Sequence, residues 1–185
     1  STLNGNTAFY KLKASGAKRL LVLTPGDQYA FSRLLTERLG IEWPEGVELR
    51  EVISLLEEKS AEGRLKFKTS VDQRPYSYID PTHSLRVPAR NAAPRHLLAG
   101  VMPGAGRELF WRKERSHPSG NGALQFPRPH ISTHLAYSRL ADAQQAGAQV
   151  IISEDPGCLS HLNRHADRFG LQVQGLYELL ADHLG

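Results

Sequence analysis

Cysteine is almost absent from this sequence, with Cys158 the only one among 185 residues. A single cysteine excludes an internal disulfide, a Cys-x-x-Cys pair and any iron–sulfur cluster held by several cysteines of this chain alone. The sequence also lacks an apolar run of about 18 residues, the length that a membrane-spanning helix needs. Its first residues, Ser-Thr-Leu-Asn-Gly-Asn, lack the basic-then-apolar order of a signal peptide. We therefore expect a cytoplasmic protein without a transmembrane segment.

Neither sign of charge dominates the chain. Lys and Arg number 23 against 19 Asp and Glu, which gives a net charge of +4. The basic residues are scattered except for a cluster at Arg107, Arg112, Lys113 and Arg115. Such a cluster is typical of a solvated face or of a surface for an acidic partner. Since no recognisable nucleic-acid-binding motif accompanies it, we expect no nucleic-acid binding.

Short apolar runs alternate with segments of helical period along most of the chain. The expected strands lie at 20–23, 47–49, 77–79, 109–111 and 150–152, with a further short one at 65–67. The expected helices lie at 7–15, about 28–39, 52–59, 93–102, 129–146 and 159–169. In three of them helical period predicts the residues that face inward, which are Phe31, Leu34, Leu35 and Leu39 in the second, Val52, Leu55 and Leu56 in the third, and Ile131, Leu135, Leu140 and Ala143 in the fifth. Strands that alternate with helices indicate parallel sheets covered by helices. The predicted fold class is therefore α/β.

Two parts of the chain follow the same order of elements. Aligned without gaps, Gly16-Ala17 matches Gly147-Ala148, and Pro25-Gly26 matches Pro156-Gly157. In both parts a helix, a glycine, a short strand and a Leu-Leu helix follow. This internal repeat predicts two pseudo-repeated, Rossmann-like lobes at 1–60 and 76–185, joined by a connector at 61–75.

Candidate functional residues cluster at three corners that follow strands or strand-like runs, at 80–86, 116–124 and 155–158. Sites in parallel α/β sheets form beyond the carboxyl ends of the strands, so we expect these corners to converge on one pocket. The residues expected to line this ligand pocket are Asp80, Thr82, His83, Arg86, Ser119, Gly120 and Asn121.

Metal binding is one chemistry that these corners suggest. His83, His117, Asp155 and Cys158 offer nitrogen, oxygen and sulfur donors that suit a zinc-like ion. The alternative is structural, because histidines beside turns often hydrogen-bond to the backbone and Asp155 is placed to cap the helix that follows. An anion site is a second possibility: Arg86 and His83 suit a carboxylate or phosphate, unless Arg86 forms a surface ion pair.

Thiol chemistry at Cys158 is a third possibility. Cys158 follows the strand at 150–152 and begins a helix, and the positive end of a helix dipole lowers a thiol's pKa. Cys158 would then act as a nucleophile with His83 or His117 as its base. The alternative is a buried cysteine that fills a small gap in the core.

The order of these corners resembles the CCG-type cysteine-rich domain family. That family includes the B subunit of heterodisulfide reductase and the iron–sulfur subunits of glycolate, lactate and glycerol-3-phosphate dehydrogenases. Its members have an Asp-Pro-Cys-His corner, a Cys-Cys-Gly-x-Gly-Gly loop and a Cys-x-x-Cys motif. The matching segments here are Asp80-Pro81-Thr82-His83, Pro118 to Ala123, and Asp155 to Cys158. Residues 7–58 resemble the second half of a preceding copy.

The resemblance implies electron transfer through a 4Fe-4S cluster, but the sequence departs from the family pattern at its ligands. The cysteine positions fall on Thr82, Pro118, Ser119, Asp155 and Cys158, so only one thiol is present. We therefore expect no cofactor from this chain alone, with zinc as the alternative. The function implied is assembly or partner contact within a 2-hydroxy-acid dehydrogenase-like oxidoreductase complex. The expected partners are a flavoprotein and a ferredoxin-like iron–sulfur protein.

Overall fold

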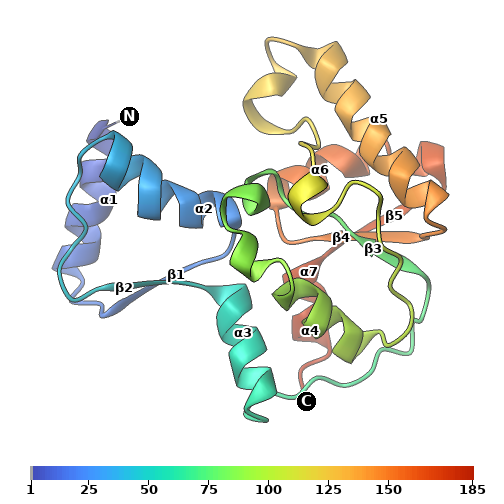
Figure 1. Ribbon diagram of the computed structural model, residues 1–185, viewed down its shortest axis with the longest axis horizontal. Coiled ribbons are helices and arrows are strands. Elements are labelled where there is room, and N and C mark those ends of the chain that lie inside the picture. Colours follow the sequence, from blue (N-terminus) through green and yellow to red (C-terminus); the bar gives the residue numbers. More distant parts are fainter. Residues whose placement is uncertain (1) are drawn as a thin grey trace.

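Two separate parallel sheets, each flanked by helices, organise the computed structural model, which describes residues 2–185 (Figure 1). This arrangement confirms the predicted α/β fold class. One sheet pairs β1 with β2, and the other has the strand order β3-β4-β5. None of the helices described in this range is long and apolar enough to cross a membrane.

Residues 2–61, which we call the N-terminal lobe, carry the two-stranded sheet. Its elements are α1 (Thr2–Ala14), β1 (Arg19–Val22), α2 (Pro25–Tyr29), β2 (Glu48–Glu51) and α3 (Val52–Ala61). After Tyr29 the chain continues as a π-helix over Ala30–Arg38. The sequence predicted that Leu34 and Leu39 face inward with Phe31, but both leucines are exposed. A π-helix has more residues per turn than an α-helix, so the inward face predicted from α-helical period is wrong here.

Residues 76–185, which we call the C-terminal lobe, carry the three-stranded sheet and most of the buried apolar residues. Its strands and α-helices are β3 (Tyr76–Tyr78), α4 (Ala93–Val101), α5 (Pro129–Gln145), β4 (Val150–Ser153), α6 (Pro156–Asn163), β5 (Gln172–Gly175) and α7 (Leu176–Asp182). Short 3-10 helices lie at Thr82–Arg86, Pro88–Arg90, Lys113–Arg115, Gly122–Gln125 and Ala166–Phe169. All four residues of β4 are buried, as expected of a central strand with both faces covered.

Two hydrophobic clusters cover the opposite faces of this sheet. On one face, Val150 and Ile152 pack with α4 and α7, and on the other Ile151 packs with α5 and α6. Ile53 of α3 is completely buried in the first cluster, so α3 packs against the C-terminal lobe. The inward face predicted for this helix, Val52, Leu55 and Leu56, does not include Ile53.

The strand predicted at 109–111 is wrong, because this segment is an irregular loop. The amide groups of Phe110 and Trp111 donate to the two carboxylate oxygens of Asp142 on α5, at 3.1 and 2.9 Å. A side chain thus takes the donors that a neighbouring strand would need. The strand expected at 65–67 is reduced to a single antiparallel bridge between Phe67 and Leu184.

Candidate functional site

The three predicted corners do meet in the structure. They enclose a cavity of about 360 Å³ beyond the carboxyl end of β4. Its lining residues are Thr82, His83, Pro118, Gly120, Asn121, Gly122, Ala123, Leu124 and Asp155. Four of the seven predicted pocket residues therefore face this cavity, and Asp80, Arg86 and Ser119 have other surroundings.

Asp80 anchors the first corner, 80–86, to the loop that contains Lys113 and Ser116. Its carboxylate is buried and accepts two hydrogen bonds from Arg95 of α4, at 2.9 and 2.8 Å. The same carboxylate accepts from the amide of Lys113, and the Asp80 carbonyl accepts from the Ser116 hydroxyl. A bidentate arginine–carboxylate pair of this kind fixes the orientation of the buried carboxylate. Asp80 thus positions the corner and does not line the cavity.

The second corner lies directly against α5. The Ser132 hydroxyl donates to the Gly120 carbonyl at 2.6 Å. A Cβ on Gly120 would lie 2.3 Å from the Ser132 carbonyl oxygen, and Gly120 has a φ of +87°. Only glycine suits both requirements. Ser119 is buried, and its hydroxyl donates to the Asn121 amide oxygen at 3.2 Å.

The N-terminal lobe covers part of the first corner. The His83 ring stacks on Tyr29 of α2, with 5.9 Å between ring centroids. The Arg86 guanidinium lies over the same ring, 4.8 Å from its centroid. This cation–π contact, and not the surface ion pair that the sequence suggested, is the contact of Arg86 in the structure.

Asp155 caps α6 as the structural alternative predicted. Its Oδ1 accepts from the Cys158 amide at 2.8 Å. Cys158 itself is only 2% exposed, and burial raises the pKa of its thiol to about 11. Hydrogen bonds with Ser119 and Ser153 offset part of this effect. Burial and the raised pKa favour the structural alternative, a buried cysteine in the core, over an activated thiol.

The predicted zinc set is not assembled either. Within residues 2–185, no group of three or more His, Cys, Asp or Glu side chains is placed to hold a metal ion. His117 lies beside the Pro118 carbonyl and the Ser138 hydroxyl, at 2.9 and 3.3 Å, and burial lowers its pKa. His83 is stacked on Tyr29 and Asp155 caps α6, so each proposed ligand has a structural partner of its own.

Two buried groups near the corners were missed by sequence reasoning. Arg139 of α5 is completely buried, and its Nη1 donates to the Trp111 carbonyl while Nε and Nη2 have no protein partner. Burial lowers the pKa of its guanidinium. Helical period directed Ile131 inward on α5, yet Ile131 is half-exposed. Nothing in the pattern marked Arg139, since arginine is seldom buried without an acidic partner.

The second missed feature is an ion network between the lobes. Arg90 bonds to both oxygens of Glu154 and forms an ion pair with Glu51 at the end of β2, with Nε and Oε1 2.6 Å apart. Tyr78 also donates to Glu154, and the Tyr177 hydroxyl lies 3.1 Å from the Glu154 carboxylate. A cavity of about 460 Å³ adjoins this network, lined by Leu23, Thr24, Asp27, Glu154, Asp155, Pro156, Leu159, Tyr177 and Glu178. The position of Glu154 directly after the apolar strand β4 is the sequence feature that points to this network.

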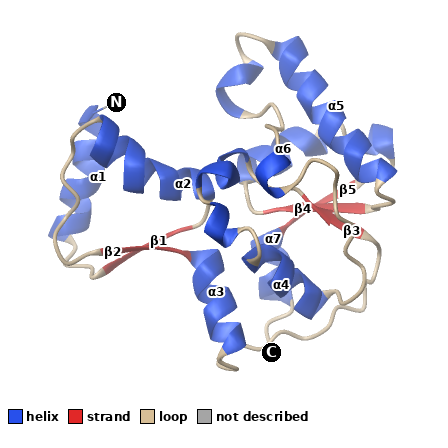
Figure 2. Cartoon of the chain, viewed as in Figure 1, coloured by secondary structure: helices blue, strands red, loops and turns tan. Residues whose placement is uncertain are grey.

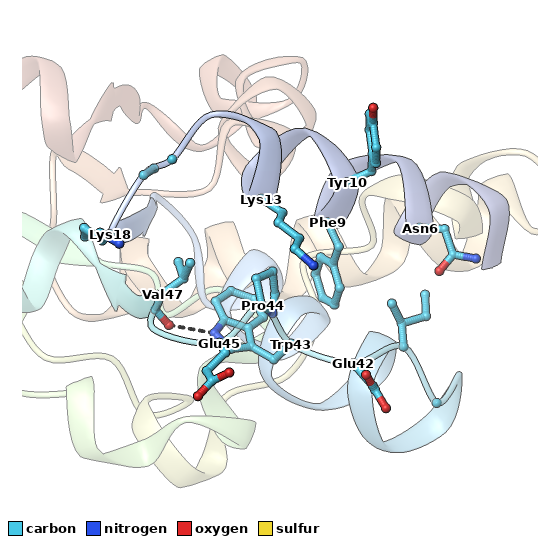
Figure 3. Close-up of a pocket in the computed structure, with 14 residues that line it drawn as sticks. Asn6, Phe9, Tyr10, Lys13, Lys18, Glu42, Trp43, Pro44, Glu45 and Val47 are labelled. Atoms are coloured by element: carbon cyan, nitrogen blue, oxygen red, sulfur yellow. Dashed lines mark hydrogen bonds between the residues drawn. The ribbon is translucent and has the colours of Figure 1, made fainter.

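A larger cavity of about 760 Å³ lies in the N-terminal lobe, between α1 and the segment 40–47. Figure 3 shows Phe9, Trp43 and Pro44 on its walls, with Lys13 extended toward them. Phe9 and Trp43 make an edge-to-face contact at 5.2 Å, and the Trp43 Nε1 donates to the Val47 carbonyl. None of the predicted site residues lies here.

Comparison with known proteins finds two that are similar to this chain over most of its length. No family model matches the chain. The chain is 27% identical over 181 residues to the D subunit of dihydromethanophenazine:CoB–CoM heterodisulfide reductase from Methanosarcina acetivorans, and 26% identical over 177 residues to its counterpart from Methanosarcina barkeri. Each match covers 94% of this chain but 42% of the relative. The sequence predicted a resemblance to a family that includes the B subunit of heterodisulfide reductase, and the similarity found is to the D subunit, of which the chain spans less than half.

Proposed function

We propose that this chain is part of an oxidoreductase complex of the heterodisulfide reductase type, in which it serves assembly or partner contact and carries no cluster of its own. The observation that carries the proposal is the set of residues at the three corners. Similarity to the heterodisulfide reductase relatives over nearly the whole chain supports the redox association. The corner residues support the absence of an electron-transfer role.

The donor set at the corners does not fit a 4Fe-4S cluster. The family's cysteine positions carry Thr82, Pro118, Ser119, Asp155 and Cys158. Proline has no side-chain donor, and hydroxyls are poor ligands for soft iron–sulfur centres. The Asp155 carboxylate already caps α6, and burial keeps the Cys158 thiol protonated. We therefore derive no electron-transfer step through such a group.

We further propose that the chain consists of two related lobes, at 1–60 and 76–185, joined at 61–75. The two strand pairs support this. In both, the four residues of the first strand lie opposite the four residues of the second, from Arg19 opposite Glu48 in β1–β2 and from Val150 opposite Gln172 in β4–β5. The corners after β1 and β4 also agree. Thr24 accepts from the Asp27 amide at one corner, as Asp155 accepts from the Cys158 amide at the other.

The partners that we propose are a flavoprotein and a ferredoxin-like iron–sulfur protein, and a 2-hydroxy-acid dehydrogenase-like complex is the alternative to one of the heterodisulfide reductase type. A chain without a cluster contributes to such a complex by holding redox proteins in position. The network of Arg90, Glu51 and Glu154 supports this role, because it makes the chain's own two lobes a fixed scaffold.

Anaerobic purification of the untagged protein tests the proposal. We expect no iron, no acid-labile sulfide and no absorption band near about 400 nm. The matched control is a variant with cysteine at Thr82, Pro118, Ser119 and Asp155, reconstituted with iron and sulfide in parallel. A band and stoichiometric iron in the unaltered chain would contradict the proposal and restore electron transfer.

A small-molecule site in the 360 Å³ cavity is the second candidate. His83 and Asn121 offer polar groups there, but the Asp155 carboxylate on the same wall disfavours an anion. A neutral polar ligand fits this lining better. Soaking crystals in a library of small neutral fragments would test the site. Fragment density that disappears in Asn121→Leu would support it, and density confined to other cavities would exclude it.

A further inference from the structure

The loop that carries the second corner contains an Asn-Gly pair, Asn121-Gly122. Gly122 begins the 3-10 helix Gly122–Gln125, which lies beside α5 and directly before it in the chain (Figure 2). Its φ is +73°, a backbone conformation that residues with a side chain rarely adopt. The fold therefore favours glycine directly after Asn121. An asparagine in this position can react with the backbone of its own chain.

The Gly122 amide is free to act as a nucleophile. The first amides of a helix have no partner within the helix, and in the part of the chain that the structure describes the Gly122 amide donates no hydrogen bond. A Cβ on Gly122 would meet no atom within 4 Å beyond its chain neighbours, so the space beside this residue is open. The nitrogen can thus give up its proton to solvent and approach the Asn121 side chain without displacing other groups.

The Asn121 side chain is held as an electrophile. Its Oδ1 accepts a hydrogen bond from the Ser119 hydroxyl at 3.2 Å, and Ser119 is only 3% exposed. A buried donor on a carbonyl oxygen stabilises the negative charge that forms there when a nucleophile adds. A Cβ on Gly157 would lie 2.8 Å from the Asn121 Nδ2 and 3.2 Å from the Asp155 Oδ1. The nitrogen that would leave therefore lies near a carboxylate.

We propose that Asn121 is a self-modification site, at which the asparagine converts to aspartate and isoaspartate through a cyclic imide with Gly122. Water is the co-reactant, and no enzyme takes part. The structure supplies the free amide, the open space beside Gly122 and the Ser119 hydroxyl. All of these lie within residues 119–122, so the inference rests neither on the proposed redox association nor on an unoccupied surface.

The reaction exchanges one ammonia for one water. The deprotonated Gly122 nitrogen attacks the Asn121 Cγ, a new C–N bond closes the imide ring, and Nδ2 takes a proton from water and leaves as ammonia. Water then adds to a carbonyl of the ring and breaks a C–N bond. Cleavage at Cγ restores the ordinary backbone with an aspartate side chain. Cleavage at the backbone carbonyl gives isoaspartate, in which the chain runs through the former side chain.

Either product changes the wall of the 360 Å³ cavity. A carboxylate replaces the neutral amide of Asn121 on the wall that already carries the Asp155 carboxylate. Two like charges in one cavity repel each other and attract cations. The converted chain should therefore disfavour the neutral ligand that suits the unconverted one. Isoaspartate also lengthens the backbone in a loop that lies against Ser132.

Incubation of the purified chain at pH 8 and 37 °C tests the proposal. Mass spectrometry of the digested protein follows the gain in mass at Asn121, and fragmentation separates aspartate from isoaspartate. A synthetic peptide of residues 116–126 is the reference, and we expect the folded chain to convert at least as fast as this peptide. Ser119→Ala should slow conversion in the folded chain about fivefold, because one hydrogen bond to Oδ1 is lost, and should leave the rate of the peptide unchanged.

Ser153→Ala is the matched control, since it removes a buried hydroxyl that donates to the Ile79 carbonyl and not to Asn121. It should convert within about twofold of the unaltered chain. Thermal unfolding checks that Ser119→Ala is folded. If it is not, Asn121→Gln replaces it and should form no acid at this position, because its longer side chain closes the ring far more slowly. The proposal is overturned by slower conversion in the folded chain than in the peptide, by equal rates in the two serine variants, or by acid formation at position 121 in Asn121→Gln.

Discussion

At the scale of single residues, Cys158 shows how burial decides chemistry. Its position at the start of α6 suggested an activated thiolate, but burial raises its pKa from the ordinary 9.0 to about 11. We expect iodoacetamide at pH 7.5 to leave the native thiol unmodified and to label it fully in urea, because only the thiolate reacts. Rapid labelling of the folded protein would show that the sulfur is accessible and charged.

The same shift gives Cys158 an effect on stability. The folded state holds the thiol proton more tightly than the unfolded state, so the free energy of unfolding should fall as the pH rises from 9 to 11. The loss should be on the order of 2 kcal/mol. Cys158→Ala provides the control, because it removes this titration and retains those of tyrosine and lysine. Urea unfolding of both proteins across this pH range measures the difference.

At the scale of elements, Arg90 joins the 3-10 helix Pro88–Arg90 to the ends of β2 and β4. Its side chain is 2% exposed and meets the carboxylates of Glu51 and Glu154. Arg90→Met would leave two carboxylates buried without their cation, which costs about 3–5 kcal/mol. Urea unfolding at pH 7 should show this loss. A partial recovery is expected toward pH 5, where the stranded carboxylates take up protons.

Glu51→Gln is the matched variant for this network. Burial raises the pKa of Glu51, so the folded state favours its protonated form, and stability from this residue declines as the pH rises above 4.5. Replacement by the neutral amide should cost much less than Arg90→Met and should abolish that part of the pH dependence. Equal losses from the two variants would show that the network acts through packing and not through charge.

Elements with a long, regular pattern were the ones that the sequence predicted well. The helix expected at 129–146 is α5, Pro129–Gln145, and the one expected at 93–102 is α4, Ala93–Val101. The convergence of the three corners was also predictable, because strand order places their ends together. Side-chain partners were not: Asp142 takes the amides of Phe110 and Trp111, and Asp80 pairs with Arg95. Such pairings depend on how the chain packs, and no periodic pattern in the sequence predicts them.

At the scale of the whole molecule, the two lobes differ in how many buried hydrophobic side chains they contain. The N-terminal lobe has few buried hydrophobic side chains of its own, among them Phe9, Val22 and Ile41, whereas both large clusters belong mainly to the C-terminal lobe. Ile53 and the Arg90 network join the lobes, and the Tyr177 hydroxyl donates to the Leu23 carbonyl at 2.6 Å. The stability of the N-terminal lobe therefore depends on its contacts with the other.

The two tryptophans report on the lobes separately, because Trp43 packs on Phe9 in the first and Trp111 lies beside Phe110 in the second. Trp111→Phe and Trp43→Phe each leave one reporter. Their urea transitions, followed by fluorescence, should have the same midpoint, since a lobe with so small a core unfolds with its neighbour. Adding Arg90→Met should move the Trp43 midpoint below that of Trp111, because the ion network that couples the lobes is then lost. Separate midpoints without Arg90→Met would mean that the lobes unfold independently and that the network contributes little to their coupling.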